Sequence, residues 1–404
     1  MIGMLSRKLG LPEERAAIPF GLATLINYIG TGIFYPFVLL FFRYQSGASL
    51  VAVGTCYTLA TGVGVLAVVR TGNLVDRFGP RAAMVTDSLI RAVIYFSFQW
   101  IHSLVLLTVL AAVAAIADRT DKVAVQAMVY GLAPTRARPG WFALSRMTLN
   151  AGMGGGALIG GLVILSSATR YPLLARWDGV SFAVAAAICL FLHPARAPAL
   201  ATAHLPRASG WADHLFLKVA ALSGLLYMIG LSIEIGLPIY LIHFLHESTW
   251  TVSLAFGVNT GMVALLQLPI TERTRSRPAM VTMAKGTVGY SLAFLLFLVF
   301  PLFRGGPLII LLVAAVSLCT IGELVMSVAS MVAINEIATP ERRGGYLGLS
   351  EFFVGAGVTA APLLFTAVLT LSPALLWIGL AVVSAGIAVG SLALSRPVMI
   401  RSER

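Results

Sequence analysis

The sequence has 404 residues, of which 58% are hydrophobic and 11% charged, and its mean hydropathy is +0.92. Soluble domains carry charge on about a quarter of their residues, so this composition excludes an ordinary soluble protein and indicates a chain that lies largely in a bilayer. The formal net charge of +12 would suit nucleic acid. The arginines, however, separate apolar segments and form no basic face with interleaved aromatics, so no nucleic-acid partner is expected.

Apolar stretches long enough to cross a bilayer as helices, which takes about 20 residues, follow one another along the chain. Six are expected in the first half, at 17–42, 49–69, 82–100, 104–130, 141–165 and 177–193. Six more are expected in the second half, at 217–244, 250–270, 279–301, 307–333, 345–371 and 374–394. The polar start, Met1 to Arg15, precedes a long apolar run without a small-residue cleavage site, which predicts a first span and not a removed signal.

A stretch rich in Ala, Pro, Arg and His separates the two sets of spans. We therefore predict an all-α membrane protein of two six-helix bundles, residues 1–193 and 217–404, joined by a cytoplasmic linker at 194–216. With the N-terminus placed in the cytoplasm, the outer loops carry only Arg43, Arg170, Arg176 and Arg304, and the spans hold Arg91, Arg119, Lys122, Arg146 and Lys285. The other 19 of the 28 basic residues then lie in cytoplasmic segments. This bias predicts that both termini are cytoplasmic.

Gly72, Asp76, Arg77, Gly79 and Arg81 lie between the second and third spans, in an expected basic turn. Glycines permit tight turns and close helix approach, arginines hold a loop in the cytoplasm, and an aspartate can bind the N-terminus of a helix. The run resembles the signature loop G-x-x-x-D-R-x-G-x-R of the major facilitator superfamily. That resemblance implies a secondary transporter in which the aspartate docks on the start of helix 11 and steadies one conformation. The alternative is a positive-inside loop with an incidental acid.

The two halves of the chain repeat. Residues 132–146 align with 337–351 at a constant offset of 205 (337 − 132), with Leu144-Ser145 matched by Leu349-Ser350. Parallel halves of this kind are expected of the superfamily. The second copy of the basic turn, at 271–278, keeps its charge but lacks the glycines, so only the first copy is expected to act as a conformational latch.

Charged residues inside spans are costly in hydrocarbon unless they are paired or hydrated. Asp87 and Arg91 lie four residues apart in the third span, on one helix face, which favours a structural ion pair over a proton site. The fourth span holds Asp118-Arg119-Thr120-Asp121-Lys122. Two acids and two bases can form a neutral cluster, or they can form the polar wall of a central cavity whose carboxylates exchange partners. Both interpretations stay open.

The fifth span carries Gly152, Gly156, Gly160 and Gly161. The pattern resembles the antiporter signature G-x-x-x-G-P-x-x-G-G of drug exporters in the superfamily, although Ala157 stands in place of the proline. The resemblance implies drug export, and close helix packing is the alternative. Arg146 and Glu351 occupy equivalent positions of the repeat and are a predicted cytoplasmic gate, with an arginine that reaches toward the interface as the alternative.

Glu234 and Glu323 lie midway along the seventh and tenth spans, with no Lys or Arg within one helical turn in the sequence. Glu323 also occupies the repeat position of Asp118 (323 − 205 = 118). Burial disfavours the charged form of a carboxylate, so such groups can bind and release a proton. The alternative is a carboxylate held by an arginine of another helix, such as Arg91 or Arg119. Asn27, Tyr28, Tyr35 and Tyr227 are further candidates for a cargo cavity, with packing as the alternative for each.

The sequence contains no phosphate-binding loop, nucleophile motif or metal-ligand spacing, and Cys56, Cys189 and Cys319 form no CxxC pair. We therefore expect no enzyme, cofactor or metal site. The prediction is a proton-coupled antiporter of the cytoplasmic (inner) membrane, acting as a monomer, that exports an amphipathic organic compound. The alternative is a proton symporter that imports a sugar, peptide or organic acid. A membrane scaffold or lipid-modifying enzyme is the remaining class.

Overall fold

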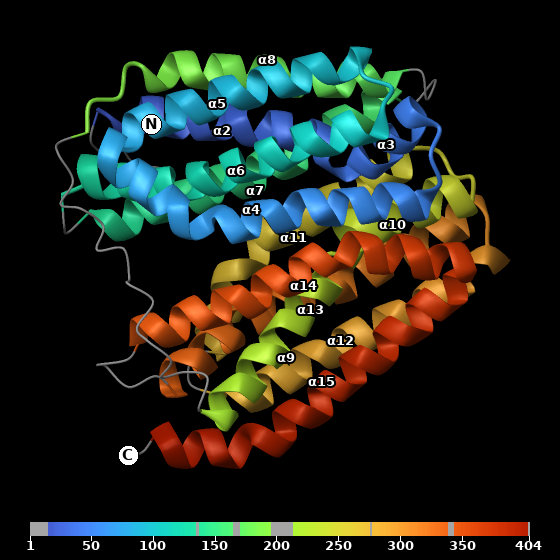
Figure 1. Cartoon of the computed structure of the whole chain (residues 1–404). Coiled ribbons are helices and arrows are strands. Elements are labelled where there is room, and N and C mark those ends of the chain that lie inside the picture. The colour runs from blue at the N-terminus through green and yellow to red at the C-terminus, as the bar shows by residue number, and fades with distance from the viewer. Residues whose placement is uncertain are drawn as a thin grey trace, which may run out of the picture. The chain divides into compact units, whose positions relative to one another are not determined.

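The computed structural model describes residues 15–134, 137–164, 170–194, 213–274, 277–337 and 343–402, and its regular structure in these ranges is helical (Figure 1). By length and composition, nine of the described helices can cross a membrane. Three further long helices, α5 (Pro80–Ser97), α6 (Leu104–Leu132) and α11 (Trp250–Thr274), bring the described number to twelve. The predicted all-α fold is therefore confirmed.

The helices group into two compact units, one of Met1–Ser49 and Leu59–Thr202 and the other of Leu50–Thr58 and Ala203–Arg404. The expected bundles differ from these units mainly at the start of α4 (Leu50–Phe78), whose first residues group with the second unit. There the backbone N–H of Leu363 donates a hydrogen bond to Oγ1 of Thr58, at 3.0 Å. The expected linker, 194–216, lies for the most part outside the described residues.

In the first unit, two helices, α2 (Ala17–Phe34) and α5, each pack along two others. Besides α2, α4, α5 and α6, its elements are η1 (Tyr35–Phe37), α3 (Val38–Ser46), η2 (Phe98–Trp100), α7 (Arg138–Ile164) and α8 (Tyr171–Cys189). Pro36 has no N–H to donate, which accounts for the 3₁₀ turn between α2 and α3. Helix α2 packs along α7 and α8, while α5 packs along α8 and α6 (Figure 1).

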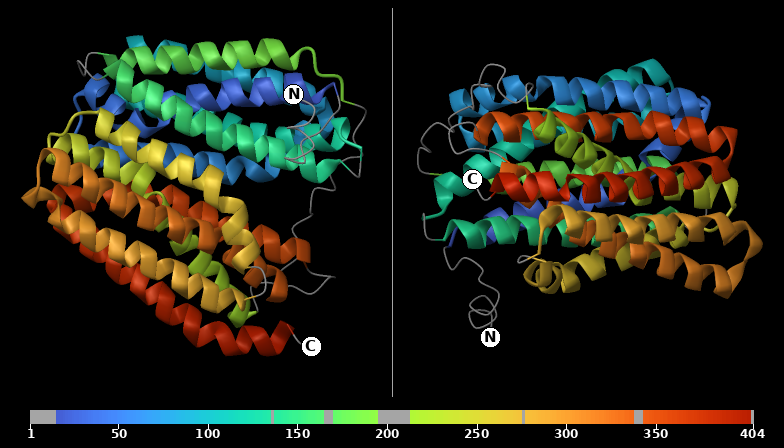
Figure 2. Two further views of the ribbon diagram at one scale, coloured as in Figure 1. Left: turned by 180° about the vertical axis from the view of Figure 1, so that it is seen from behind. Right: turned by 90° about the horizontal axis from the view of Figure 1, so that it is seen from below.

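The second unit repeats these pairings. Its elements are α9 (His214–Gly230), η4 (Ser232–Gly236), α10 (Leu237–Ile239), η5 (Tyr240–Phe244), α11, α12 (Ala279–Val299), η6 (Phe300–Leu302), α13 (Gly305–Ile337), α14 (Arg343–Leu371) and α15 (Pro373–Ser402). Helix α9 packs along α14 and α15, and α12 packs along α15 and α13. Helices α12 and α15 run side by side in both Figure 1 and Figure 2. The sequence repeat therefore corresponds to a repeat of helix packing.

Candidate functional site

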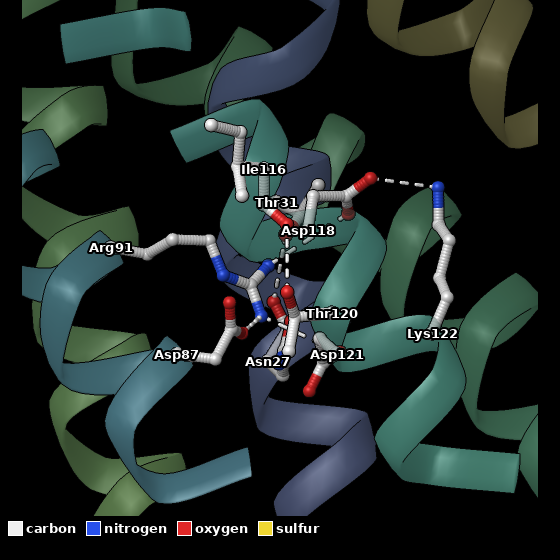
Figure 3. A network of polar contacts seen from close by, with 9 residues as sticks. All are labelled: Asn27, Thr31, Asp87, Arg91, Ile116, Asp118, Thr120, Asp121 and Lys122. Atoms are coloured by element: carbon white, nitrogen blue, oxygen red, sulfur yellow. Dashed lines mark hydrogen bonds and ion pairs between the residues drawn. The ribbon is translucent and has the colours of Figure 1, made fainter. Parts of the chain in front are cut away.

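A charged cluster lies inside the first unit, and Arg91 is at its centre (Figure 3). The spacing of Asp87 and Arg91 on α5 brings both side chains to one helix face, and Nη2 of Arg91 lies 2.5 Å from Oδ2 of Asp87. The same nitrogen lies 3.4 Å from Oδ2 of Asp121 on α6, and Nη1 lies 4.0 Å from Oδ1 of Asp118. The Arg91 side chain is 4% exposed. Two helices thus converge on one buried guanidinium.

Helix α8 adds an acid that the sequence analysis missed. Asp178 is 1% exposed, and Arg91 is the basic group that acts electrostatically on it. One turn further along α8, the ring of Phe182 lies against the guanidinium of Arg91, 4.2 Å from ring centroid to Cζ. We expected the sixth span to begin at residue 177, which would leave Asp178 at its outer end. The helix begins at Tyr171, with Pro172 in its first turn, and so carries Asp178 into the interior.

The carboxyl groups around Arg91 outnumber its positive charge. Asp87, Asp121 and Asp178 are all buried, and the Oδ1 atom of each has no hydrogen-bond partner among the described residues. A buried carboxylate without partners costs several kcal/mol, whereas the protonated group is far cheaper to bury. An arrangement of three acids around one base is therefore able to bind a proton.

Asp118 and Lys122 form a separate pair at the edge of this cluster. Nζ of Lys122 lies 2.8 Å from Oδ2 of Asp118, one helical turn away, and the two side chains are 49% and 42% exposed. Arg119, between them in the sequence, is partly buried. The sequence offered a self-neutralised group on α6, and the structure instead divides its two acids. Asp118 pairs with Lys122, while Asp121 turns toward Arg91 (Figure 3).

The second unit holds Glu323 by an amide. Nδ2 of Asn259, on α11, donates hydrogen bonds to Oε2 of Glu323 (3.1 Å) and to Oγ1 of Thr320 (3.0 Å), both on α13. Sequence analysis did not single out Asn259, although it is a polar residue in the middle of an expected span. An amide can donate to a charged or a neutral carboxyl group, so this contact does not require Glu323 to be ionised.

Glu234 lies in an irregular part of the seventh span. Its segment, η4, is a π-helical turn, and Pro238 follows within α10. Such turns occur often at functional sites because they redirect side chains. Glu234 is partly buried. Tyr290 of α12 is fully buried, and both Glu234 and Glu323 act electrostatically on it. Both glutamates are therefore within electrostatic range of the Tyr290 hydroxyl.

Comparison with known proteins identifies the family. The sequence profile of the Major Facilitator Superfamily matches residues 20–322, well over half of the chain. The chain belongs to the major facilitator superfamily. It is therefore a secondary transporter of this superfamily, and the predicted transport function is confirmed at that level. The search of curated proteins found no match.

Solved structures of transporters share this superfamily fold. A POT family transporter in complex with a thioalcohol-conjugated peptide has a TM-score of 0.75 at 14% identity, covering 96% of this chain and 99% of its own. The nucleoside transporter NupG has a TM-score of 0.70 at 13% identity, with 97% and 100% covered. A bacterial homologue of the human lysosomal transporter Spinster, inward-facing and occupied, has a TM-score of 0.67 at 13% identity, with 96% and 94% covered. Identities this low establish the fold alone.

The superfamily signature between α4 and α5 is more helical than its sequence indicates. We expected a turn from Gly72 to Arg81, but α4 continues to Phe78 and α5 begins at Pro80. Gly79 alone makes the break, with φ +83° and ψ 154°, a conformation open essentially only to glycine. Asp76 and Arg77 are exposed, and Arg81 donates a hydrogen bond to the carbonyl of Leu190 at the end of α8. The role of Asp76 as a latch stays a prediction.

The glycines of α7 lie against α2. A Cβ atom on Gly152 would lie 2.6 Å from Cβ of Tyr28, and Cβ atoms on Gly156 and Gly160 would overlap the backbone of α2 at Ile29 and Ile33. Only glycine allows so close a helix contact. This geometry accounts for the glycine pattern by packing, which was one of the two interpretations. Gly161 and Ala157 are buried in the same helix.

The remaining predicted residues are spread over both units. Asn27 is buried on α2, where its backbone carbonyl oxygen accepts a hydrogen bond from the hydroxyl of Thr31. Tyr35 is partly buried in η1. Tyr227 is 46% exposed on α9. Arg146 and Glu351 are exposed on α7 and α14, and their role as a gate stays a prediction. Within the described residues, no group of His, Cys, Asp and Glu is placed to hold a metal ion.

Proposed function

We propose that this transporter is a proton-coupled antiporter that exports an amphipathic organic compound by alternating access. The observation that carries the proposal is the buried cluster of three carboxyl groups, Asp87, Asp121 and Asp178, around Arg91. A carrier that uses a proton gradient needs a group whose proton affinity changes with its surroundings. A buried excess of acids over bases meets that requirement, because a shift of the guanidinium changes which carboxylate is stabilised.

The proposed cargo class rests on the types of side chain that the transmembrane helices carry. The transmembrane helices carry aromatic and amide side chains, and the described residues hold no candidate metal site. An amphipathic organic compound fits such surfaces, because aromatic rings contact its apolar part while amides and carboxyl groups contact its polar part. The glycines of α7 serve the close packing on α2, and export is supported only by the resemblance of their spacing to the antiporter signature of drug exporters.

The membrane orientation is part of the same proposal. The excess of Lys and Arg in alternate loops supports cytoplasmic termini, and the cytoplasmic membrane is the compartment in which a proton gradient drives export. Each chain contains both units and its own acid clusters, which supports a carrier that acts as a monomer.

Import by proton symport is the second candidate. Ala157 occupies the position of the signature proline and is fully buried, so the exporter pattern is incomplete at one residue. Two of the structures with the same fold are described as a nucleoside transporter and a POT family transporter bound to a peptide. These observations favour a nutrient cargo, and the direction of coupled proton movement separates the two candidates.

Proteoliposomes containing the full chain and a trapped pH dye test the proposal, with ethidium as the amphipathic probe. With an acidic lumen, ethidium should accumulate inside and the lumenal pH should rise, because an antiporter exchanges the probe for protons. Asp121→Asn should abolish this coupling. Glu247→Gln, at an acid that contacts Arg304 in the second unit (3.7 Å), should leave it intact. If ethidium accumulated inside only when the outer solution was acidic, the protein would be a proton symporter and not an antiporter.

A further inference from the structure

Two neighbouring helices, α2 and α5, come close to α8 at Asp178 and at the residue after it, and a glycine makes each contact possible. A Cβ atom on Gly30 of α2 would lie 2.8 Å from Oδ1 of Asp178, so this oxygen lies against the Gly30 backbone. The next residue, Gly179, is equally close to α5, where a Cβ would lie 3.0 Å from the carbonyl oxygen of Ala92. Because both glycines lack side chains, α2 packs closely against the carboxyl group and α5 packs closely against the next residue of α8. Oδ1 of Asp178 makes no hydrogen bond among the described residues, and the neighbouring hydroxyl of Ser181 donates to the backbone carbonyl oxygen of Asp178, at 2.7 Å.

The cluster also contains a donor without a partner. Nε of Arg91 is buried and makes no hydrogen bond within the described part of the chain. Nη2 of the same guanidinium is taken by Asp87 and Asp121. Since the ring of Phe182 lies on the guanidinium, the turn of α8 that carries Asp178 is next to Arg91. Because an unpaired buried donor and an unpaired buried acceptor are both unfavourable, they point to a second arrangement in which the two meet.

We propose that Asp178 binds the exchangeable proton of this cluster. It is neutral while Asp87 and Asp121 hold Arg91, and it ionises when Arg91 turns Nε toward it and Asp121 receives the proton. The step Asp178–COOH + Asp121–COO⁻ → Asp178–COO⁻ + Asp121–COOH moves one proton and leaves the net charge unchanged. This inference deepens the proposed function, since it names the residue at which coupling begins.

The position of Asp121 gives the proton a route outward. Asp121 lies between the buried Arg91 and the Asp118–Lys122 pair, which is about half exposed. A proton on Asp121 is therefore one helical turn from Asp118, whose carboxylate is partly exposed. Asp178, by contrast, is enclosed. The cluster thus extends from the enclosed Asp178, past Arg91 and Asp121, to the partly exposed Asp118.

Charged and titratable groups approach Asp178 from several elements. Arg91 of α5 acts on Asp178 directly, and the hydroxyl of Ser181 lies beside it on α8. Asp87 of α5 and Asp121 of α6 contact Arg91, and the ring of Tyr95 contacts Phe182. At Asp178, α2 presents the backbone of Gly30. Tyr44 of α3 contacts the Tyr171 end of α8, seven residues and about 10 Å along the helix from Asp178. Of these groups, only the Arg91 guanidinium carries a positive charge that can compensate an ionised Asp178, and the Ser181 hydroxyl is a neutral donor next to it.

Infrared spectroscopy of the purified full chain tests this assignment without any cargo. A protonated carboxyl group has a carbonyl stretch separate from that of a carboxylate. The wild type at neutral pH should show this band, and labelling of aspartate with ¹³C should move it, which excludes Glu234 and Glu323 as its source. Asp178→Asn should remove the band, whereas Glu247→Gln should keep it. When the pH is raised, the band should weaken in the wild type as Asp178 ionises. It should stay unchanged in Arg91→Lys, whose side chain has no Nε to stabilise the ionised Asp178.

A wild type without a protonated-aspartate band at neutral pH would overturn the assignment, even if Asp178→Asn failed to fold. A band that survives in folded Asp178→Asn would overturn it as well. Loss of the band in a variant that still exchanges ethidium for protons would support Asp178 as a proton site and contradict its place in coupling.

Discussion

Replacing Arg91 by Met is the strongest test of the charge balance in the first unit. Methionine keeps much of the length of the side chain and its packing against Phe182, and it removes the only buried positive charge found beside Asp87 and Asp121 in the described residues. At least one carboxylate that was paired with the guanidinium must then be neutralised for the unit to fold. The size of the effect follows from the free energy of protonating an ordinary aspartate.

At pH 7, protonating an aspartate of ordinary pKa, near 3.9, costs about 4 kcal/mol, because each pH unit contributes about 1.4 kcal/mol. At pH 5 the same step costs about 1.5 kcal/mol. The folded Arg91→Met variant therefore holds a proton that its unfolded chain releases, so its free energy of unfolding falls as the pH rises. We expect a loss of about 4 kcal/mol at pH 7, close to the 3–5 kcal/mol typical of broken buried pairs, and most of it should return at pH 5.

Unfolding of the purified variant in detergent, followed at pH 7 and pH 5 against the wild type, measures both quantities. Arg304→Met is the matched control, since Arg304 is 65% exposed and its contact with Glu247 is weak, and it should show no pH-dependent loss. Adding Asp121→Asn to Arg91→Met should recover stability at pH 7. A variant as stable as the wild type at pH 7, or equally destabilised at both pH values, would refute the reasoning.

Three further changes test other parts of the fold, each by thermal unfolding of the purified protein. Asn259→Ala removes the amide donor of Glu323 and should cost about 1–3 kcal/mol; an unchanged melting temperature would show that the hydrogen bond is replaced. Gly156→Ala places a Cβ against the backbone of Ile29 and should destabilise the α2–α7 contact, whereas Gly155→Ala, with open space around its Cβ, should be neutral or slightly stabilising. If both were equally tolerated, the glycine packing would be misjudged. Gly79→Ala forces alanine into φ +83° and should cost about 1–3 kcal/mol, and a normal melting temperature would argue against that conformation.

The sequence was sufficient for the fold because each span is a long apolar run, a local property. The pairing of Asp87 with Arg91 was also predictable, since residues four apart share a helix face. The convergence of α6 and α8 on Arg91 was not, because it depends on how three helices pack. Asp178 was missed because its depth depends on where α8 begins, and the start at Tyr171 is set by Pro172 and by ring contacts of Tyr171 with Phe37 and Tyr44.

In the signature stretch between α4 and α5, the motif identified the family, but its local structure was predicted wrongly. Its glycines and arginines indicated a turn, since both residue types are frequent in cytoplasmic loops, yet the residues from Gly72 to Phe78 continue α4. A single glycine followed by proline is enough to end one helix and begin the next. Motif recognition gave the right family but the wrong local structure.

The two units have come to hold equivalent acids in different ways. Asp118 and Glu323 occupy the same position of the repeat, and the packing of α5 on α6 corresponds to that of α12 on α13. Asp118 has Lys122 one turn later, whereas the residue one turn after Glu323 is Ser327, so a basic partner is missing from the sequence itself. Glu323 relies on Asn259, which can donate to either protonation state. An amide contact tolerates a change of charge, while the Arg91 cluster must reorganise when its charge changes. That difference favours the first unit as the place where proton binding alters the structure.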